Sequence, residues 1–260
     1  DVYKRQWYDN PGNIGKTWAE RVDGVMLTLD ELGPGIVCVQ EALSHQLKDI
    51  QKAGYSSFGV GRDDGIEAGE FTAILYRPEQ FNLLDGGTFW LSETPNSAGS
   101  VGWDAMLPRI ATWAELEDRA SGMPFFVINS HLSHVGETAR LESVKLILSK
   151  AGEIAANAPL ILCGDFNFRS DSDPYAYLTG ENEAFTLIDS RSLSPGHPDD
   201  PGYSFAGADF KGEPGNIIDH IFTSGQVLVS SARIVNNCRQ GRCPSDHLPV
   251  VLEFYMKPGP

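Results

Sequence analysis

The chain has 260 residues, of which 41% are hydrophobic and 21% charged, so it is long enough for one large domain with a full core. No run of eighteen apolar residues occurs, which argues against a membrane-spanning helix. The formal net charge of -15 disfavours tight, charge-driven binding of nucleic acid and favours metal cations as partners, because clustered carboxylates have to be neutralised.

The first six residues stand apart from the rest. Asp1 to Gln6 is polar and begins without Met, which is typical of a fragment start, a tag remnant or an assembly scar. We therefore interpret residues 1–6 as non-native and leave them out of the fold prediction. We expect residues 7–260 to form a single domain.

Helices and strands alternate along the rest of the chain. Apolar residues at helical spacing predict helices over Trp18–Leu32, Ser44–Ala53 and Thr138–Ala156. The predicted strands share short apolar runs bounded by turn-forming residues; they are Ile36–Val39, Phe71–Tyr76, Phe81–Leu84, Thr88–Leu91, Ile110–Leu116, Pro124–Asn129, Leu160–Cys163, Ile217–Phe222, Val227–Val235 and Leu248–Tyr255. Asp85-Gly86-Gly87 is predicted to be a turn, and residues 92–108 and 190–215 to be long loops. This order predicts an α/β fold in which two sheets pack together with helices outside.

The stretch Leu160 to Arg169 combines a strand with polar side chains. The apolar run Leu160 to Cys163 predicts a strand buried on both faces. If the chain stays extended, Asp165 and Asn167 share one face, and Phe166 points away into the core. A carboxylate beside a carboxamide offers a base or metal ligand next to a neutral donor and acceptor. A simple turn is an equally good interpretation of this stretch alone, since Gly, Asp and Asn are the usual turn formers.

Other strand ends carry the same kinds of side chain. These are Glu41, Glu70, His131, Asp219, Asp246 and His247. Each of them alone is typical of a surface residue or of an ordinary hydrogen-bonding partner. As an ordered set they supply carboxylates for a hard divalent cation, two imidazoles, and acids able to orient those imidazoles.

These strand ends lie in motifs that resemble the endonuclease/exonuclease/phosphatase superfamily, which includes deoxyribonuclease I, apurinic endonucleases, neutral sphingomyelinases and inositol polyphosphate 5-phosphatases. The matching motifs are Val39-Gln40-Glu41, Gly69-Glu70-Phe71 through Tyr76-Arg77, Asn129-Ser130-His131-Leu132, Gly164-Asp165-Phe166-Asn167, Ile218-Asp219-His220-Ile221-Phe222 and Ser245-Asp246-His247-Leu248-Pro249-Val250. They follow the family order over residues 40 to 250. The segments Trp90–Pro95 and Leu107–Trp113 are similar to segments of bacterial, often uncharacterised, branches.

The resemblance implies a four-layer α/β sandwich of two packed mixed sheets flanked by helices, as in deoxyribonuclease I. It also implies a phosphoester hydrolase that uses Mg²⁺ or Mn²⁺. Transferred motif by motif, it assigns Glu41 and Asp246 to the metal. Asp165 and Asn167 are expected to orient or activate the attacking water and to bind the phosphoryl group, and Asp219 to orient His247 on the phosphate. His131 is expected on the leaving-group side, paired with Glu70.

One departure from the family pattern concerns the first strand, which usually ends in an Asn that helps to hold the metal and water. Alignment places Arg5 there, and Asn10 is not an obvious substitute, so we expect this chain to lack that ligand. Arg109 is a candidate for phosphate binding, with a strand-end salt bridge as the alternative. Trp103 and Phe205 are candidates for substrate contacts, with ordinary loop packing as the alternative.

The leading interpretation is a metal-dependent phosphatase or phosphodiesterase that acts on a small phosphoester. A nuclease is the second interpretation. A nuclease is expected to carry a stripe of basic residues together with aromatic residues that stack on bases. In this sequence the basic residues are scattered and are outnumbered by acidic ones. A catalytically silent binding protein is a further alternative, favoured by the missing first-strand Asn. Substrate, oligomeric state and compartment are left open.

The four cysteines fall into two kinds. Cys38 and Cys163 lie in apolar runs and are predicted to be buried thiols. Cys238 and Cys243 flank a short loop and are close enough in sequence to form a small disulfide ring. Two reduced, exposed cysteines are an equally good interpretation.

Overall fold

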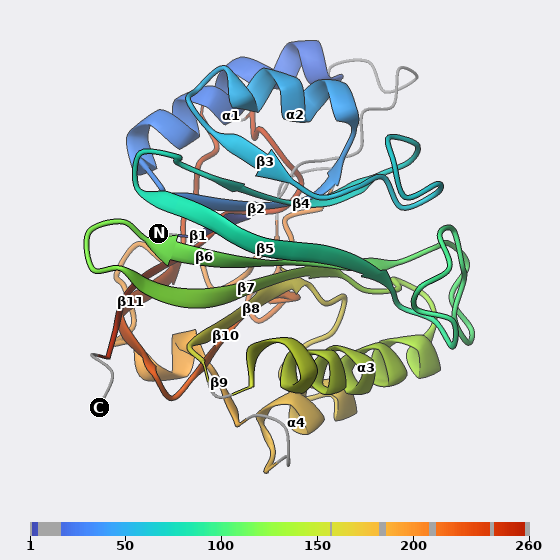
Figure 1. The fold of residues 1–260 in the computed structure, drawn as a ribbon. Coiled ribbons are helices and arrows are strands. Elements are labelled where there is room, and N and C mark those ends of the chain that lie inside the picture. Colours follow the sequence, from blue (N-terminus) through green and yellow to red (C-terminus); the bar gives the residue numbers. More distant parts are fainter. Residues whose placement is uncertain are drawn as a thin grey trace.

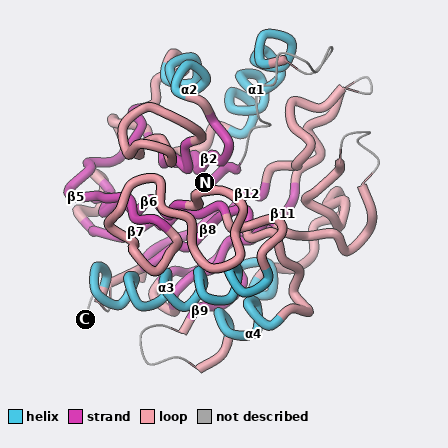
Figure 2. Tube along the Cα trace, turned by 90° about the vertical axis from the view of Figure 1, so that its right-hand side faces the viewer, coloured by secondary structure: helices cyan, strands magenta, loops and turns pink. Residues whose placement is uncertain are grey.

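The computed structural model describes residues 2–4, 17–156, 158–181, 186–207, 212–239 and 242–257. Within them the chain forms two six-stranded sheets that pack face to face, with helices on both outer sides (Figure 1). Figure 2 turns the right-hand side of Figure 1 toward the viewer and shows the same layers, with many loops at that end of the sheets. The predicted four-layer α/β sandwich is therefore confirmed.

The first sheet has the strand order β11-β12-β1-β2-β4-β3. Its strands in chain order are β1 (Val2–Lys4), β2 (Ile36–Ala42), β3 (Ser56–Phe58), β4 (Phe71–Tyr76), β11 (Val227–Ile234) and β12 (Val250–Met256). The helices α1 (Trp18–Leu32) and α2 (Ser44–Gln51) cover its outer face (Figure 1).

The second sheet has the order β5-β6-β7-β8-β10-β9. Its strands are β5 (Phe81–Trp90), β6 (Ile110–Asp118), β7 (Met123–His131), β8 (Leu160–Asp165), β9 (Leu187–Asp189) and β10 (Asp219–Ser224). The helices α3 (Glu137–Ala155) and α4 (Asp173–Thr179) lie on its outer face, and a 3-10 helix spans Ser190–Leu193.

Three hydrophobic clusters fill the spaces between the layers, and the central strands contribute to two of them at once. Leu160 and Leu162 of β8 point to the cluster beneath α3, whereas Ile161 and Cys163 point to the cluster between the sheets. Because side chains alternate along a strand, a strand that is covered on both faces needs a continuous apolar run. This is the physical reason for the run that the sequence shows before Gly164.

The segment β1 lies inside the first sheet, between β12 and β2. It pairs antiparallel with β12 and parallel with β2. The segment that we left out of the fold prediction thus occupies a strand position. That residues 1–6 are non-native stays a prediction, and Arg5 and Asn10 lie outside the described residues.

The predicted turn at Asp85-Gly86-Gly87 is wrong. The chain continues through it as the single strand β5, with a bulge between Leu83 and Asp85. A Cβ at Gly86 would come within 2.6 Å of the Phe58 ring, and one at Gly87 within 2.8 Å of the Trp113 indole. Glycine is therefore needed here because aromatic side chains lie directly over the backbone, a known use of glycine inside strands.

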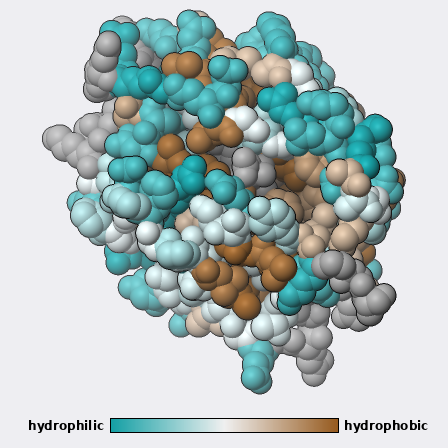
Figure 3. Space-filling model, turned by 90° about the vertical axis from the view of Figure 1, so that its left-hand side faces the viewer, coloured by the Kyte–Doolittle hydropathy of each residue, from teal (hydrophilic) through white to brown (hydrophobic). Residues whose placement is uncertain are grey.

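The surface carries scattered apolar side chains. On the face shown in Figure 3, hydrophobic patches lie among hydrophilic residues. Large exposed hydrophobic residues include Leu84 of β5, Leu228 of β11 and Tyr255 of β12. No helix in the described part of the chain is long and apolar enough to cross a membrane.

Gly164 offers a test of the central packing. A Cβ there would lie 2.2 Å from the carbonyl oxygen of Ser130 in the neighbouring strand β7. Because the obstacle is backbone, Gly164→Ala is expected to lower the free energy of unfolding by at least about 2 kcal/mol, as overpacking typically does. Urea denaturation measures this.

The matched control is Gly196→Ala, where an added Cβ meets no described atom within 4 Å. We expect a change below about 0.5 kcal/mol there. Equal stabilities of the two variants would contradict the β7–β8 geometry.

Candidate active site

The first part of the site joins the two sheets. Glu41 near the end of β2 and Glu70 just before β4 meet His131 at the end of β7, with one ligand atom of each within 4.8 Å of the others. Glu41 sits at the register shift between β2 and β4 and has a φ of 60°. Such a left-handed conformation is uncommon for a residue other than glycine and is found where a side chain is aimed for function.

The second part consists of Asp165, Asp219 and His247, all buried, whose ligand atoms also lie within 4.8 Å of one another. Asp165 ends β8 and Asp219 begins the antiparallel β10, where the two residues are direct register partners. His247 comes from the segment that leads into β12. The Nδ1 of His247 lies 2.7 Å from the Asp219 carboxylate, so Nδ1–H donates to it and Nε2 faces away.

The two parts form one continuous cluster. The Nε2 of His131 lies 3.4 Å from the Asp165 carboxylate and 3.9 Å from that of Glu41. His131 and Asp165 are register partners at the ends of the parallel strands β7 and β8. The sheet pairing therefore sets their separation, and the cluster gathers four carboxylates and two imidazoles.

A buried amide connects the sheets directly behind the cluster. The Nδ2 of Asn129 donates to the carbonyl oxygens of Val39 and Ala73, at 2.9 Å each, and its Oδ1 accepts from Gln40 Nε2 at 2.6 Å. Asn129 and Gln40 are fully buried. Both residues belong to motifs identified in the sequence, but no role was predicted for either of them.

The Asp165–Asn167 segment leaves the extended conformation after β8. Asn167 has a φ of 50°, and its backbone N–H donates to Asp165 Oδ1 at 3.0 Å. Its Nδ2 donates to the Leu132 carbonyl at 3.0 Å and lies 3.4 Å from Asp165 Oδ2. Phe166 is fully buried, as predicted. A turn and a polar site are thus both present, so the two interpretations of this stretch were not exclusive.

Two arginines lie beside the cluster. Arg62 Nη1 forms a 2.7 Å ion pair with Glu70, and Arg109 Nη2 lies 3.0 Å from His134 Nδ1. Both arginines are buried, and among the described residues Arg109 Nη1 has no hydrogen-bond partner. Burial, and then the neighbouring Arg62 cation, lower the pKa of Arg109 to about 10, so this guanidinium stays charged at neutral pH. Arg62 and His134 were missed from the sequence, because no motif marks them.

The remaining residues predicted from the sequence lie at different distances from the cluster. The Phe205 ring packs on His247, with ring centroids 4.7 Å apart. Asp246 is half-buried beside His247, but among the described residues neither carboxylate–imidazole group includes it. Trp103 lies in the loop after β5, where its backbone N–H points to Glu93. Glu70 and His131, which were predicted to pair, lie within one group, and Glu70 also forms the ion pair with Arg62.

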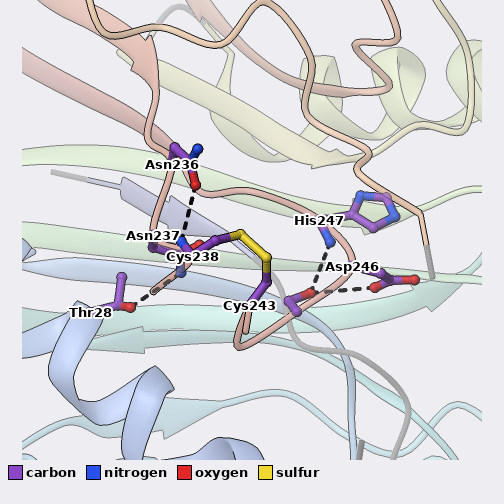
Figure 4. Close-up of a disulfide and its surroundings, with 8 residues drawn as sticks. Thr28, Asn236, Asn237, Cys238, Cys243, Asp246 and His247 are labelled. Carbon is purple, nitrogen blue, oxygen red and sulfur yellow. Dashed lines mark hydrogen bonds between the residues drawn. A yellow bond between two sulfur atoms is a disulfide. The ribbon is translucent and has the colours of Figure 1, made fainter. Parts of the chain in front are cut away.

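A disulfide between Cys238 and Cys243 closes the loop that leads to Asp246 and His247 (Figure 4). The loop docks on α1, where Arg21 Nη1 donates to the Pro244 carbonyl at 2.7 Å. The predicted disulfide is therefore present, and Cys38 and Cys163 are buried thiols outside any disulfide, as predicted. The covalent ring limits the freedom of the segment that carries His247.

The donor set fits a hard divalent cation. Glu41, Glu70, Asp165 and Asp219 offer carboxylate oxygens at close range, and His131 and His247 add nitrogen donors. Mg²⁺ and related cations prefer such oxygen ligands, and the mutual repulsion of the carboxylates falls when a cation binds.

A four-layer sandwich with carboxylates and imidazoles gathered where its sheets meet is the architecture of the deoxyribonuclease I-like hydrolases. The chain matches the model of the endonuclease/exonuclease/phosphatase family over residues 13–247 and belongs to this family. Members of the family include phosphatases and nucleases and generally depend on divalent metals.

Three relatives place the chain within the family. A solved endonuclease/exonuclease/phosphatase from Bacteroides vulgatus is 38% identical, with a TM-score of 0.90 and 98% of both chains covered. A mannosyl-6-phosphatase from Bacteroides thetaiotaomicron is 33% identical, with a TM-score of 0.86, covering 98% of this chain and 99% of that one. Nocturnin from Rattus norvegicus is 25% identical over 91% of this chain but only 58% of its own length. The chain thus spans little more than half of that curated relative.

Thiol titration tests the disulfide. The unreduced, denatured protein is expected to expose two reactive thiols, those of Cys38 and Cys163, and the reduced protein four. Four reactive thiols before reduction would show that the ring does not form.

Proposed function

We propose that this protein is a divalent-metal-dependent phosphoester hydrolase that acts on a small phosphoester, a phosphatase in the first instance. The observation that carries the proposal is the continuous cluster of four carboxylates and two imidazoles at the meeting of the two sheets. Hydrolysis of a phosphoester requires an activated water on one side of phosphorus and relief of negative charge on the other. The cluster offers groups for both tasks.

The cation site consists of Glu41 and Glu70 with His131 at its edge, extended by Asp165. A bound Mg²⁺ or Mn²⁺ would neutralise negative charge that develops on the phosphoryl oxygens. The predicted contribution of Asp246 stays a prediction.

Other residues of the cluster are suited to proton transfer, to binding of the phosphoryl group and to the leaving-group side. Asp165 is suited to accept the proton of the attacking water, and the Asn167 amide to hold the phosphoryl group or the water. When both of its nitrogens are protonated, His247 is suited to donate through Nε2 to a phosphoryl oxygen while its Nδ1–H donates to Asp219. His131, close to Asp165 and Glu41, is suited to the leaving-group side.

Arg109 supports a terminal phosphate as the ligand. Its buried Nη1 has no hydrogen-bond partner in the described part of the chain, and a charged donor left unsatisfied at this depth is costly unless something accepts from it. Phosphate oxygens are good acceptors for a guanidinium. A net charge of -15 disfavours a polyanionic nucleic acid, whose binding depends on many cationic contacts. The name of the 33% identical neighbour, a mannosyl-6-phosphatase, also supports a small phosphomonoester.

The test is a screen for phosphate release with Mg²⁺ or Mn²⁺ over small phosphomonoesters, small phosphodiesters and plasmid DNA. We expect turnover of a small phosphoester that stops when a chelator removes the metal. Efficient plasmid degradation with inert small phosphoesters would favour a nuclease instead, and full turnover in chelator would contradict the metal requirement.

Two substitutions test the assignment of roles. Asp165→Asn and His247→Ala are each expected to lower turnover at least about a hundredfold, the usual effect of losing an acid–base or charge-stabilising group. Asp30→Asn, at an exposed position of α1, is the matched control and should keep full activity. Near-normal rates in folded Asp165→Asn or His247→Ala protein would mean that the roles are misassigned.

A further inference from the structure

A cavity of about 700 Å³ lies on the outer side of the second sheet and comes close to the catalytic cluster at Asn167. Its walls are the first turns of α3 and the segment from Asn167 to Pro174, with Ile218 between them. Asn167 connects the cavity with the catalytic cluster, because it lines the cavity and its Nδ2 lies 3.4 Å from the Asp165 carboxylate. A phosphoester held at the cluster could therefore extend into this space.

The cavity wall carries charges of both signs. Arg140 and Arg169 provide two guanidinium groups, and Glu137, Asp171 and Asp173 provide three carboxylates. Arg169, Asp171 and Asp173 are exposed, so their polar atoms are available to a ligand. The formal charge of these five groups is -1, and this does not suit a second phosphate or a nucleic acid backbone.

Part of the cavity wall is apolar. Phe168 and Pro174 are buried there, and Leu141 and Ile218 are half-buried. An apolar surface can pack against the face of a ligand ring, while charged groups at its border form hydrogen bonds with the substituents of that ring. Carboxylates accept from hydroxyl groups and guanidinium groups donate to them, so that adjacent hydroxyls are recognised in pairs.

We propose that this cavity binds the leaving group of the substrate and that the leaving group is an uncharged polyhydroxylated ring, such as a hexose. The inference rests on the proposed phosphatase function and adds to it the location and chemistry of the specificity pocket. In the reaction, water forms the new P–O bond, the bond between phosphorus and the ester oxygen breaks, and the sugar leaves as the alcohol after taking up a proton. Arg169 is the specificity-determining residue that we single out.

Arg169 suits a test because it is exposed and its ion pair with Asp171 is long, with 3.7 Å between Nε and Oδ1. Arg140, by contrast, donates to the Ser133 carbonyl at 3.0 Å, close to His131, so its removal would disturb the cluster as well. Arg119, exposed at the end of the β6–β7 hairpin, provides a matched arginine outside the cavity.

The experiment compares mannose 6-phosphate with cyclohexylmethyl phosphate, a probe of the same ring size without ring hydroxyls. We expect Arg169→Ala to lower kcat/KM for mannose 6-phosphate about tenfold or more, mainly through KM, because a hydrogen bond from a charged donor is lost. For cyclohexylmethyl phosphate the same variant should change kcat/KM less than about twofold, since that probe offers no hydroxyl to Arg169. Arg119→Ala should leave both substrates unaffected.

The outcomes separate the two proposals. If wild-type protein hydrolyses neither probe nor any other phosphoester in the presence of metal, the proposed function is wrong. If it hydrolyses phosphoesters but does not favour mannose 6-phosphate or another sugar phosphate over cyclohexylmethyl phosphate, the polyol pocket is wrong. Equal losses on both probes in Arg169→Ala, or no loss on either, would also overturn the pocket while leaving the phosphatase assignment intact.

Discussion

The structure of the site depends on one buried amide. Asn129 of β7 donates to the carbonyls of Val39 and Ala73 in the opposite sheet and accepts from Gln40. A buried donor or acceptor left without a partner costs about 1–3 kcal/mol, so these bonds hold the sheets in a defined relation at this point. Glu41 follows Gln40 directly, and His131 lies two residues after Asn129. The amide therefore fixes how the carboxylates of one sheet approach the imidazole of the other.

The charge distribution of the site follows from this arrangement. Four carboxylates converge with little or moderate exposure, and such a group repels itself unless cations are close. Arg62 compensates Glu70, and Arg109 adds a second buried cation. A divalent cation would complete the balance of charge. The same positive groups that offset the carboxylate charge lie close to where the negative charge of a phosphoester would be bound.

Much of the fold and part of the site could be predicted from the sequence, for physical reasons. A strand buried on both faces must be apolar throughout, and Leu160 to Cys163 was therefore recognisable. Polar residues at the ends of neighbouring strands meet on one side of the sheet, as His131 and Asp165 do at the ends of β7 and β8 and Asp219 does at the start of the antiparallel β10. The family motifs identified the same residues independently.

The rest depended on contacts that a linear sequence does not display. The glycines of β5 were predicted to form a turn. The side chains that require glycine there, Phe58 and Trp113, are distant in the sequence, so their contact with β5 could not be recognised from it. Arg62 and His134 gain their place in the site only through Glu70 and Arg109. The cavity beside Asn167 arises where α3 approaches the segment before the short helix α4, which sequence reasoning missed.

The central claim is that residues of both sheets form a single cation centre, and the dependence of thermal unfolding on Mn²⁺ tests it most directly. Ligand that binds only the folded state raises Tm. We expect Mn²⁺ to raise the Tm of the wild-type protein, and Glu41→Gln in the first sheet and Asp165→Asn in the second each to remove most of that shift. A full Mn²⁺-dependent shift in either folded variant would contradict a centre shared between the two sheets.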